Sequence, residues 1–125
     1  MDTRTKILTA EAAPRACTVD TGAFDPVLAD DARELAEIRA CHPDRPLLVV
    51  VLPLPGELLP GRARAELVAA LRMVDYVVTA DDAATATATD ALLASLEPAY
   101  LVRLEEAQAV RRRQLMEHVH RRQTS

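Results

Sequence analysis

The sequence predicts an α/β fold: a Rossmann-like open parallel sheet of four or five strands with helices on both faces. Strand-like and helix-like segments alternate along the chain, and parallel pairing of such strands needs a crossover between each pair. The apolar run at residues 47–52 is rich in valine and does not alternate with polar residues, which is typical of a strand covered on both faces. A length of 125 residues provides material for one core. We therefore expect a single domain over residues 1–125.

The first half of the chain predicts two strands and one helix. A strand is expected at residues 16–19, followed by a turn at Thr21 and Gly22. A helix is expected from about 30 to 41, because Asp30 and Asp31 precede an apolar stripe at helical spacing and Glu34 completes a capping pattern. Prolines then break the helix before the strand at 47–52. Residues 53–61 contain three prolines and two glycines, which predicts an irregular loop.

The second half repeats the alternation. The expected elements are a helix at 62–72, a strand at 74–79, an Ala/Thr/Asp-rich loop at 79–89, a helix at 90–96, a strand at 100–102 and a helix at 104–122. In open α/β sheets, ligands bind beyond the carboxyl ends of the strands. This rule points to the loops at 21–28, 53–61 and 79–89 and to the segment after Val102.

Composition excludes several classes of function. A net charge of −4 and only three aromatic residues disfavour nucleic-acid binding, which relies on positive charge and stacking platforms. No apolar run approaches the roughly 20 residues of a membrane-spanning helix, and no signal segment opens the chain, so we expect a cytoplasmic protein without a membrane partner. Cys17 and Cys41 have neither disulfide-framework nor zinc-knuckle spacing and are expected to be core thiols.

A short motif suggests a family. The residues Gly22-Ala23-Phe24-Asp25-Pro26 resemble the nucleotide loop of the cytidylyltransferase-like nucleotidyltransferases, especially the adenylyltransferase domain of ADP-heptose synthases. Four further segments resemble that domain in the same order: its lead-in at 6–9, its second strand at 48–52, its helix and "VDxVV" strand at 64–78, and its "LkPdvlvKG" strand at 96–103. The resemblance implies the same Rossmann-like fold, which agrees with the pattern of elements.

The resemblance also implies a reaction, for which this chain lacks the expected residues. Family members displace pyrophosphate from a nucleoside triphosphate, usually with magnesium, and use an HxGH motif at the first helix. Here that motif reads Leu28-Ala29-Asp30-Asp31, so both histidines are replaced, and we expect the two carboxylates to repel a triphosphate. The family's lysine after the second strand has no counterpart, although Arg103 stands where another family lysine lies. The later "STT" segment is missing, so we expect a domain truncated at its C-terminal end relative to the family.

Two functions follow as expectations. The first is a degenerate nucleotidyltransferase-like domain, a pseudoenzyme without catalytic residues or a cofactor, that acts as a binding or assembly module. Its vestigial nucleotide-binding residues would be Gly22, Ala23, Phe24, Asp25 and Arg103. The alternative is a divergent adenylyl- or cytidylyltransferase acting on a sugar phosphate or similar acceptor, with magnesium and ATP or CTP. It would need Arg103 and unrecognised donors in place of the missing imidazoles.

The remaining charged residues have simpler explanations beside the functional ones. Asp25, Asp30 and Asp31, or Asp81 and Asp82, could hold a hard cation, but helix capping and solvation explain them, and we expect no metal. His118 and His120 would face different sides of a helix. Residues 103–125 carry six arginines against three glutamates. We interpret this segment as a solvated face or as a docking surface for an acidic partner or a second copy.

Overall fold

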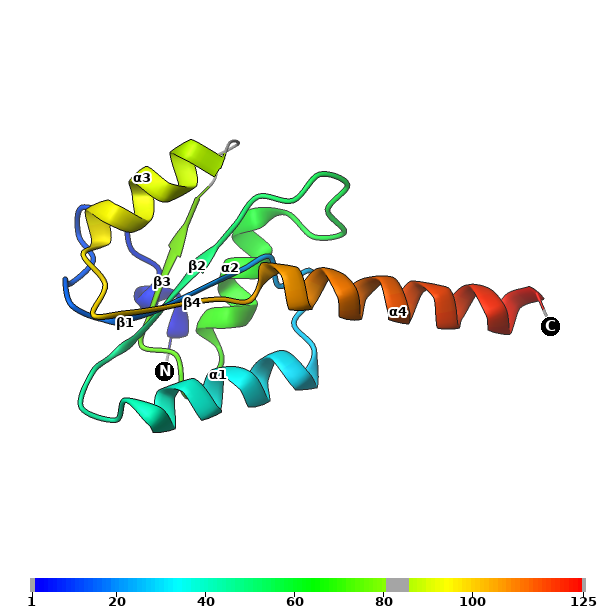
Figure 1. Ribbon diagram of the computed structural model, residues 1–125, viewed down its shortest axis with the longest axis horizontal. Helices are drawn as coiled ribbons and strands as arrows, with labels where there is room; N and C mark the ends of the chain where they lie inside the picture. The colour runs from blue at the N-terminus through cyan, green and yellow to red at the C-terminus, as the bar shows by residue number, and fades with distance from the viewer. Residues whose placement is uncertain (1, 81–85, 125) are drawn as a thin grey trace.

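The computed structural model describes residues 2–80 and 86–124 and confirms the α/β fold class. Its described part contains one all-parallel sheet in the order β3-β2-β1-β4 (Figure 1). The strands are β1 (Thr18–Gly22), β2 (Leu47–Val51), β3 (Tyr76–Thr79) and β4 (Tyr100–Arg103). Asp81 and Asp82 lie outside the described residues, as do residues 83–85 of the predicted loop around them.

Helices cover both faces of the sheet. They are α1 (Ala29–Cys41), α2 (Gly61–Ala69), α3 (Ala86–Leu96) and α4 (Glu105–Thr124), preceded by a short 3-10 helix, η1 (Thr3–Lys6). Leu35 of α1 and Val68 of α2 pack with Val49 on one face, and Leu93 of α3 packs with Val50 on the other. Because β2 faces apolar side chains on both sides, its sequence is the unalternating apolar run that identified it.

The first strand is displaced from its expected position at residues 16–19. Ala16 adopts φ 60°, in the left-handed region, so the chain turns there and pairing begins at Thr18. Thr21 and Gly22, expected in a turn, instead continue the strand opposite Val50 and Val51. The motif that follows Gly22 is thereby placed at the carboxyl end of β1.

Other element boundaries also differ from the predictions. Helix α2 ends at Ala69 rather than at residue 72, because the chain turns and Asp75 N–H donates to Leu47 O. Strand β3 accordingly begins at Tyr76 rather than 74, and α3 begins at Ala86 rather than 90. Alanine has the highest helix propensity, so the Ala/Thr-rich segment extends the helix backwards. Cys17 is buried as expected, but Cys41 is exposed at the end of α1.

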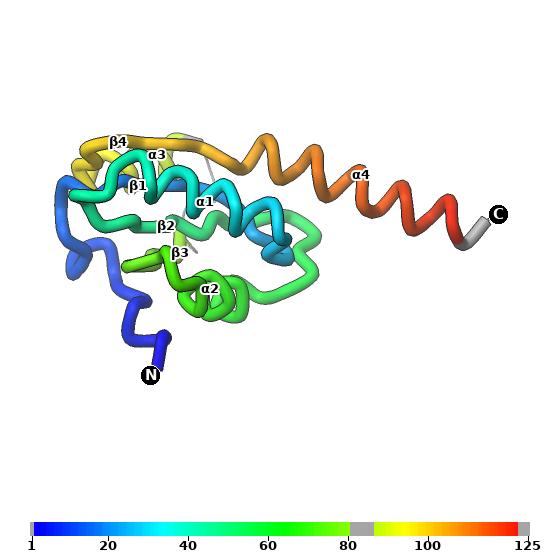
Figure 2. The backbone as a smooth tube through the Cα atoms, turned by 90° about the horizontal axis from the view of Figure 1, so that it is seen from below, coloured from blue at the N-terminus to red at the C-terminus, as the bar shows by residue number. Residues whose placement is uncertain are grey.

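Helix α4 leaves the body of the molecule (Figures 1 and 2). Its first turn packs on β1, whereas the described side chains from residue 113 to 122 are all exposed. Among these, Leu115, Met116 and Val119 are apolar and roughly half exposed. In the part of the chain that the structure describes, no helix is both long and apolar enough to cross a membrane.

Candidate functional site at the carboxyl ends of β1 and β4

The strand order fixes where a ligand would enter. The chain winds from β1 through β2 to β3 in one direction and then returns to place β4 on the other side of β1. The crevice between the carboxyl ends of β1 and β4 is therefore the topological switch point, where open α/β sheets bind ligands. Gly22 ends β1 at this crevice and Arg103 ends β4. The predicted motif residues are thus at the position expected of a binding loop.

Gln108 of α4 occupies this crevice. Its Oε1 accepts hydrogen bonds from the backbone N–H of Ala23 at 2.8 Å and of Phe24 at 3.1 Å. Phe24 is buried and has φ 52°, an uncommon conformation for a residue with a side chain, and these bonds help to hold it. Two backbone donors that could face an anionic ligand are therefore bound within the chain.

Gly22 allows this close packing. A Cβ at this position would lie 2.6 Å from Gln108 Oε1, 2.7 Å from its Nε2 and 2.7 Å from Phe24 Cε2. A glycine is required here because α4 and the loop approach the backbone closely, not because a turn needs positive φ. Buried Gln108 Nε2 has no hydrogen-bond partner among the described residues.

Arg103 is bound to two acidic side chains beside this crevice. Its Nε donates to Glu105 Oε1 at 2.8 Å, and its Nη1 lies 3.4 Å from Asp90 Oδ1. Glu105 also accepts from the Thr21 hydroxyl. Burial by itself would raise the pKa of Glu105, but hydrogen bonds from Thr21, its own backbone and Arg103 outweigh this, so the pKa lies below its ordinary value. Arg103 therefore serves an ion-pair cluster beside the crevice.

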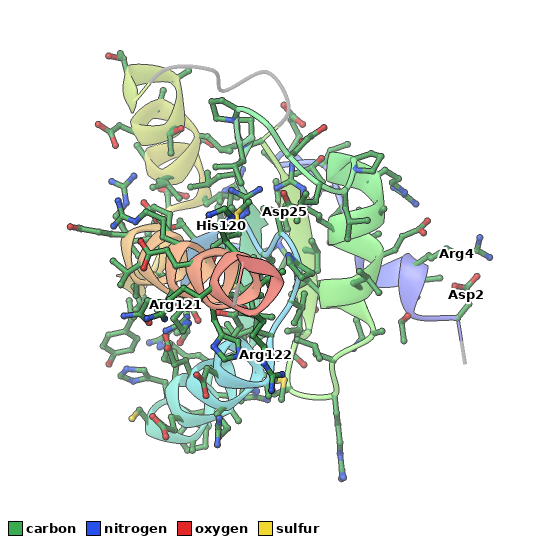
Figure 3. All side chains as sticks on the ribbon, turned by 90° about the vertical axis from the view of Figure 1, so that its right-hand side faces the viewer. Asp2, Arg4, Asp25, His120, Arg121 and Arg122 are labelled. Carbon is green, nitrogen blue, oxygen red and sulfur yellow. The ribbon has the colours of Figure 1, made fainter. Side chains whose placement is uncertain are left out.

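Asp25 organises the proline-rich loop. Its buried carboxylate accepts from the backbone N–H of Leu58 at 2.5 Å and of Leu59 at 2.8 Å, and Arg112 Nη2 lies 4.0 Å away. Figure 3, which views the molecule from the far end of α4, shows Asp25 beside the helix. Arg112 completes a contact between the loop after β1, the loop after β2 and α4.

Arg64 forms hydrogen bonds to both of these loops. The side chain is almost fully buried on α2, and its Nη1 donates to Ala23 O and to Leu52 O, both at 2.8 Å. Its Nε donates to Leu59 O at 3.0 Å, and its Nη2 pairs with Glu57 at 2.7 Å. Sequence reasoning assigned no role to Arg64 or Gln108, since nothing in their local pattern shows which distant backbone they contact.

The acids at the start of α1 are paired with arginines. The helix begins at Ala29, before the expected capping acids, and Asp31 within its first turn accepts from Leu28 N–H at 2.8 Å. Asp31 also pairs with Arg111 at 2.6 Å. Arg111 bonds Glu34 as well, so it is not part of a solvated face. Asp30 is exposed and pairs with Arg33. Neither carboxylate is therefore unpaired: Asp31 is neutralised by Arg111, and Asp30 pairs with Arg33 at the surface.

The space that remains is a cavity of about 270 Å³ between these loops and α4. Its charged lining is mixed, with Asp25, Asp31 and Glu105 against Arg112 and Arg113. Apolar side chains supply much of the rest of the wall: Phe24, Leu28, Leu52, Leu54 and Leu115. Of the predicted site residues, Ala23, Phe24 and Asp25 line this cavity. Gly22 lies beneath Gln108, and Arg103 is not part of the wall.

One buried acid was not identified from the sequence. Asp20 lies in the middle of β1 between Val49 of β2 and Val102 of β4, fully buried, and neither carboxylate oxygen has a hydrogen-bond partner among the described residues. Burial, with a smaller contribution from the charge of Glu34, raises its pKa to about 7. This acid lies within the sheet and not at the crevice.

The described residues contain no cluster of three or more His, Cys, Asp or Glu side chains able to hold a metal ion. Asp25, Asp30 and Asp31 are separately engaged by backbone amides, Arg33 and Arg111. The charged groups of the crevice are thus largely paired with one another around the cavity. No protein-family model and no curated protein matches the chain.

Proposed function

We propose that this chain is a degenerate nucleotidyltransferase-like domain without catalytic activity, which serves as a binding or assembly module. The observation that carries the proposal is the position of Gln108. Its carboxamide oxygen accepts hydrogen bonds from the backbone N–H groups of Ala23 and Phe24 at the switch point. A phosphate group bound there would need these same donors. The enzymes that this sequence resembles use two histidine imidazoles at the first helix. Here these positions are Leu28 and Asp31, and Asp31 is paired with Arg111.

Calorimetry tests the loss of activity. Titration with ATP or CTP in the presence of magnesium should give no heat, and no pyrophosphate should be released with sugar phosphates as acceptors. The variant Gln108→Ala frees the two backbone donors, while Gln114→Ala on the exposed part of α4 is its matched control. Micromolar nucleotide binding by the unmodified chain would contradict the proposal.

The assembly role rests on α4. The helix carries five arginines against three glutamates, whereas the whole chain has a net charge of −4, so the projecting helix is positive on an acidic molecule. An exposed helix of this length gains little stability alone, and Leu115, Met116 and Val119 offer it an apolar stripe. We propose that an acidic partner or a second copy contacts this stripe.

Light scattering tests this role. A chain ending after Arg113 keeps Gln108 and Arg111 but loses the exposed stripe, so it should fold and lose the contacts that this stripe makes with a partner. The substitution Leu115→Lys should weaken assembly in the full chain, and Val110→Lys, on a different face of α4, is the control.

One observation favours the alternative, a divergent nucleotidyltransferase. Arg112 and Arg113 line the cavity and could contact phosphate groups. Under this alternative, pyrophosphate release would be detectable and would be lost in Arg112→Ala. Substitution Arg103→Ala should have little effect, because its guanidinium pairs with Glu105 and Asp90 outside the cavity.

A further inference from the structure

The two edges of the sheet differ in whether another segment of the described chain covers them. At the β3 edge, Ile7 forms a parallel bridge with Val77, and Leu8 N–H donates to Val77 O at 2.8 Å. The N-terminal segment thus covers that edge. Strand β4 pairs only with β1 among the described residues, and Figure 2 shows its outer side at the margin of the molecule. An open strand edge presents unpaired backbone groups to solvent.

The side chains of β4 are unusually apolar for an exposed edge. Tyr100 and Leu101 retain 45% and 43% of their accessible surface. Successive side chains alternate between faces, so Tyr100 and Val102 share one face while Leu101 and Arg103 share the other. Tyr100 is held in place by stacking on His42, with ring centroids 3.6 Å apart. The edge therefore presents an exposed apolar side chain on each face, and one of the two is held by a stacked ring.

The backbone pattern shows which groups are free. Leu104 N–H donates to Thr21 O at 2.8 Å, in register with the Thr21–Arg103 pairing. In a parallel ladder alternate residues direct both backbone groups to the same neighbour, so Val102 also faces β1. Leu101 and Arg103 therefore direct their N–H and C=O groups outward. Two such residues, two positions apart, form the hydrogen-bonding set of an antiparallel edge.

We propose that β4 pairs antiparallel with β4 of a second copy, with Val102 on the two-fold axis. In this register Leu101 and Arg103 of one copy form hydrogen-bonded pairs with Arg103 and Leu101 of the other, which uses all the outward groups of these residues. Val102 faces its symmetry mate as a close non-hydrogen-bonded pair. The inference rests on the proposed assembly role and adds a second surface, the β4 edge, to the stripe of α4.

Other registers are less favourable. A two-fold axis at Arg103 would place the two guanidinium groups opposite each other, and like charges directly opposite are destabilising. An axis at Leu101 would pair Arg103 with Ala99, whose N–H already donates to Cys17 O at 2.9 Å. Only the axis at Val102 satisfies the backbone and separates the arginines.

Disulfide trapping tests the register. In a Cys41→Ser background, which removes the exposed thiol, Val102→Cys should form a disulfide-linked dimer on mild oxidation, because non-hydrogen-bonded partners lie about 4.5 Å apart at Cα. The matched control is Leu101→Cys, whose symmetry mates would be displaced along the strands by two residues and should not cross-link. Equal cross-linking of both variants, or of neither, would overturn the proposal.

Sedimentation velocity over a concentration series tests the interface without oxidation. The full chain should dimerise, and Leu101→Pro should weaken dimerisation at least about tenfold, because proline removes an outward N–H without breaking the ladder to β1. Leu101→Lys, which places a lysine opposite Arg103, is a second variant, and circular dichroism checks that both are folded.

Three results would separate this inference from the proposed function. A monomer at all concentrations overturns the edge pairing. A dimer that survives Leu101→Pro and Leu101→Lys but is lost on truncation after Arg113 also overturns it and supports assembly through α4. Nucleotide turnover by a chain that still cross-links through Val102→Cys contradicts the loss of activity and leaves the edge pairing supported.

Discussion

Two fully buried aspartates lie five positions apart, one in the middle of β1 and one in the loop after it, and their surroundings are opposite. Asp25 accepts two backbone N–H groups and lies 4.0 Å from Arg112. Asp20 has no hydrogen-bond partner among the described residues, and its neighbours in the sheet are valines. Burial alone thus does not determine whether a carboxylate stabilises or destabilises the folded protein, because this depends on its hydrogen-bond and charge partners.

The comparison predicts its largest effect at Asp25. Substitution Asp25→Ala leaves the N–H groups of Leu58 and Leu59 without their acceptor and Arg112 without a nearby acid, so we expect a loss of about 3 kcal/mol in the free energy of unfolding. Urea denaturation measures it, with exposed Asp44→Ala as the control. Equal stability of the two variants would show that Asp25 does not hold the loop.

At Asp20 the expected sign is reversed: above about pH 4, substitution should stabilise the protein. The folded-state pKa is about 7 against an ordinary 3.8, so the folded protein binds the extra proton between these values, and stability falls as pH rises through this window. Substitution Asp20→Asn removes this dependence. We expect the variant to exceed the unmodified protein by about 3 kcal/mol at pH 8 and to lose this advantage near pH 4.

Urea denaturation across this pH range, with Asp44→Asn as the control, isolates the contribution of Asp20 from that of other acids. A difference between the unmodified protein and Asp20→Asn that stays constant with pH would mean that Asp20 is ionised in the folded protein at all of these pH values.

Gly22 joins the two regions, and the structure predicts that it tolerates no side chain. A Cβ would lie within 2.7 Å of Gln108 and Phe24, so Gly22→Ala should cost about 2 kcal/mol. The double variant with Gln108→Ala should recover part of this loss, because the carboxamide provides two of the three close contacts. If the two losses in the free energy of unfolding were strictly additive, the Gln108 side chain would not be what opposes a Cβ at residue 22.

Gln108 itself should have the smallest effect on stability and a clear local one. Substitution Gln108→Ala removes the acceptor of two backbone bonds, at a cost of about 1 kcal/mol. Amide hydrogen exchange at Ala23 and Phe24 should become faster, while exchange in β2 should be little affected. Unchanged exchange at these two amides would show that α4 does not hold the loop.

Much of the fold could be predicted from the sequence. The valine-rich run of β2 can only be buried on both faces, and regular alternation of elements around it leaves few topologies other than an open parallel sheet. The placement of Gly22 and Asp25 at a strand end followed from the same pattern. Strand β1 was displaced because the left-handed turn at Ala16, a residue with no turn preference, has no local signal.

The chemistry of the crevice could not be predicted in this way. Asp31 and Arg111 are separated by 80 positions, and Phe24 and Gln108 by 84, so no local pattern relates them. The arginine partners of these acids were not predicted for this reason, since a formal charge acquires its effect from the partner that the tertiary fold brings to it.

Local sequence patterns were enough to predict the layers and the alternation of strands and helices, because hydrophobic periodicity acts over neighbouring residues. The tertiary structure alone decided that Gln108 lies at the switch point and that, among the described residues, Asp20 has no hydrogen-bond partner and β4 has no second neighbour. These depend on which distant side chains meet, and on which edge the chain returns to cover, and only the packed fold fixes both.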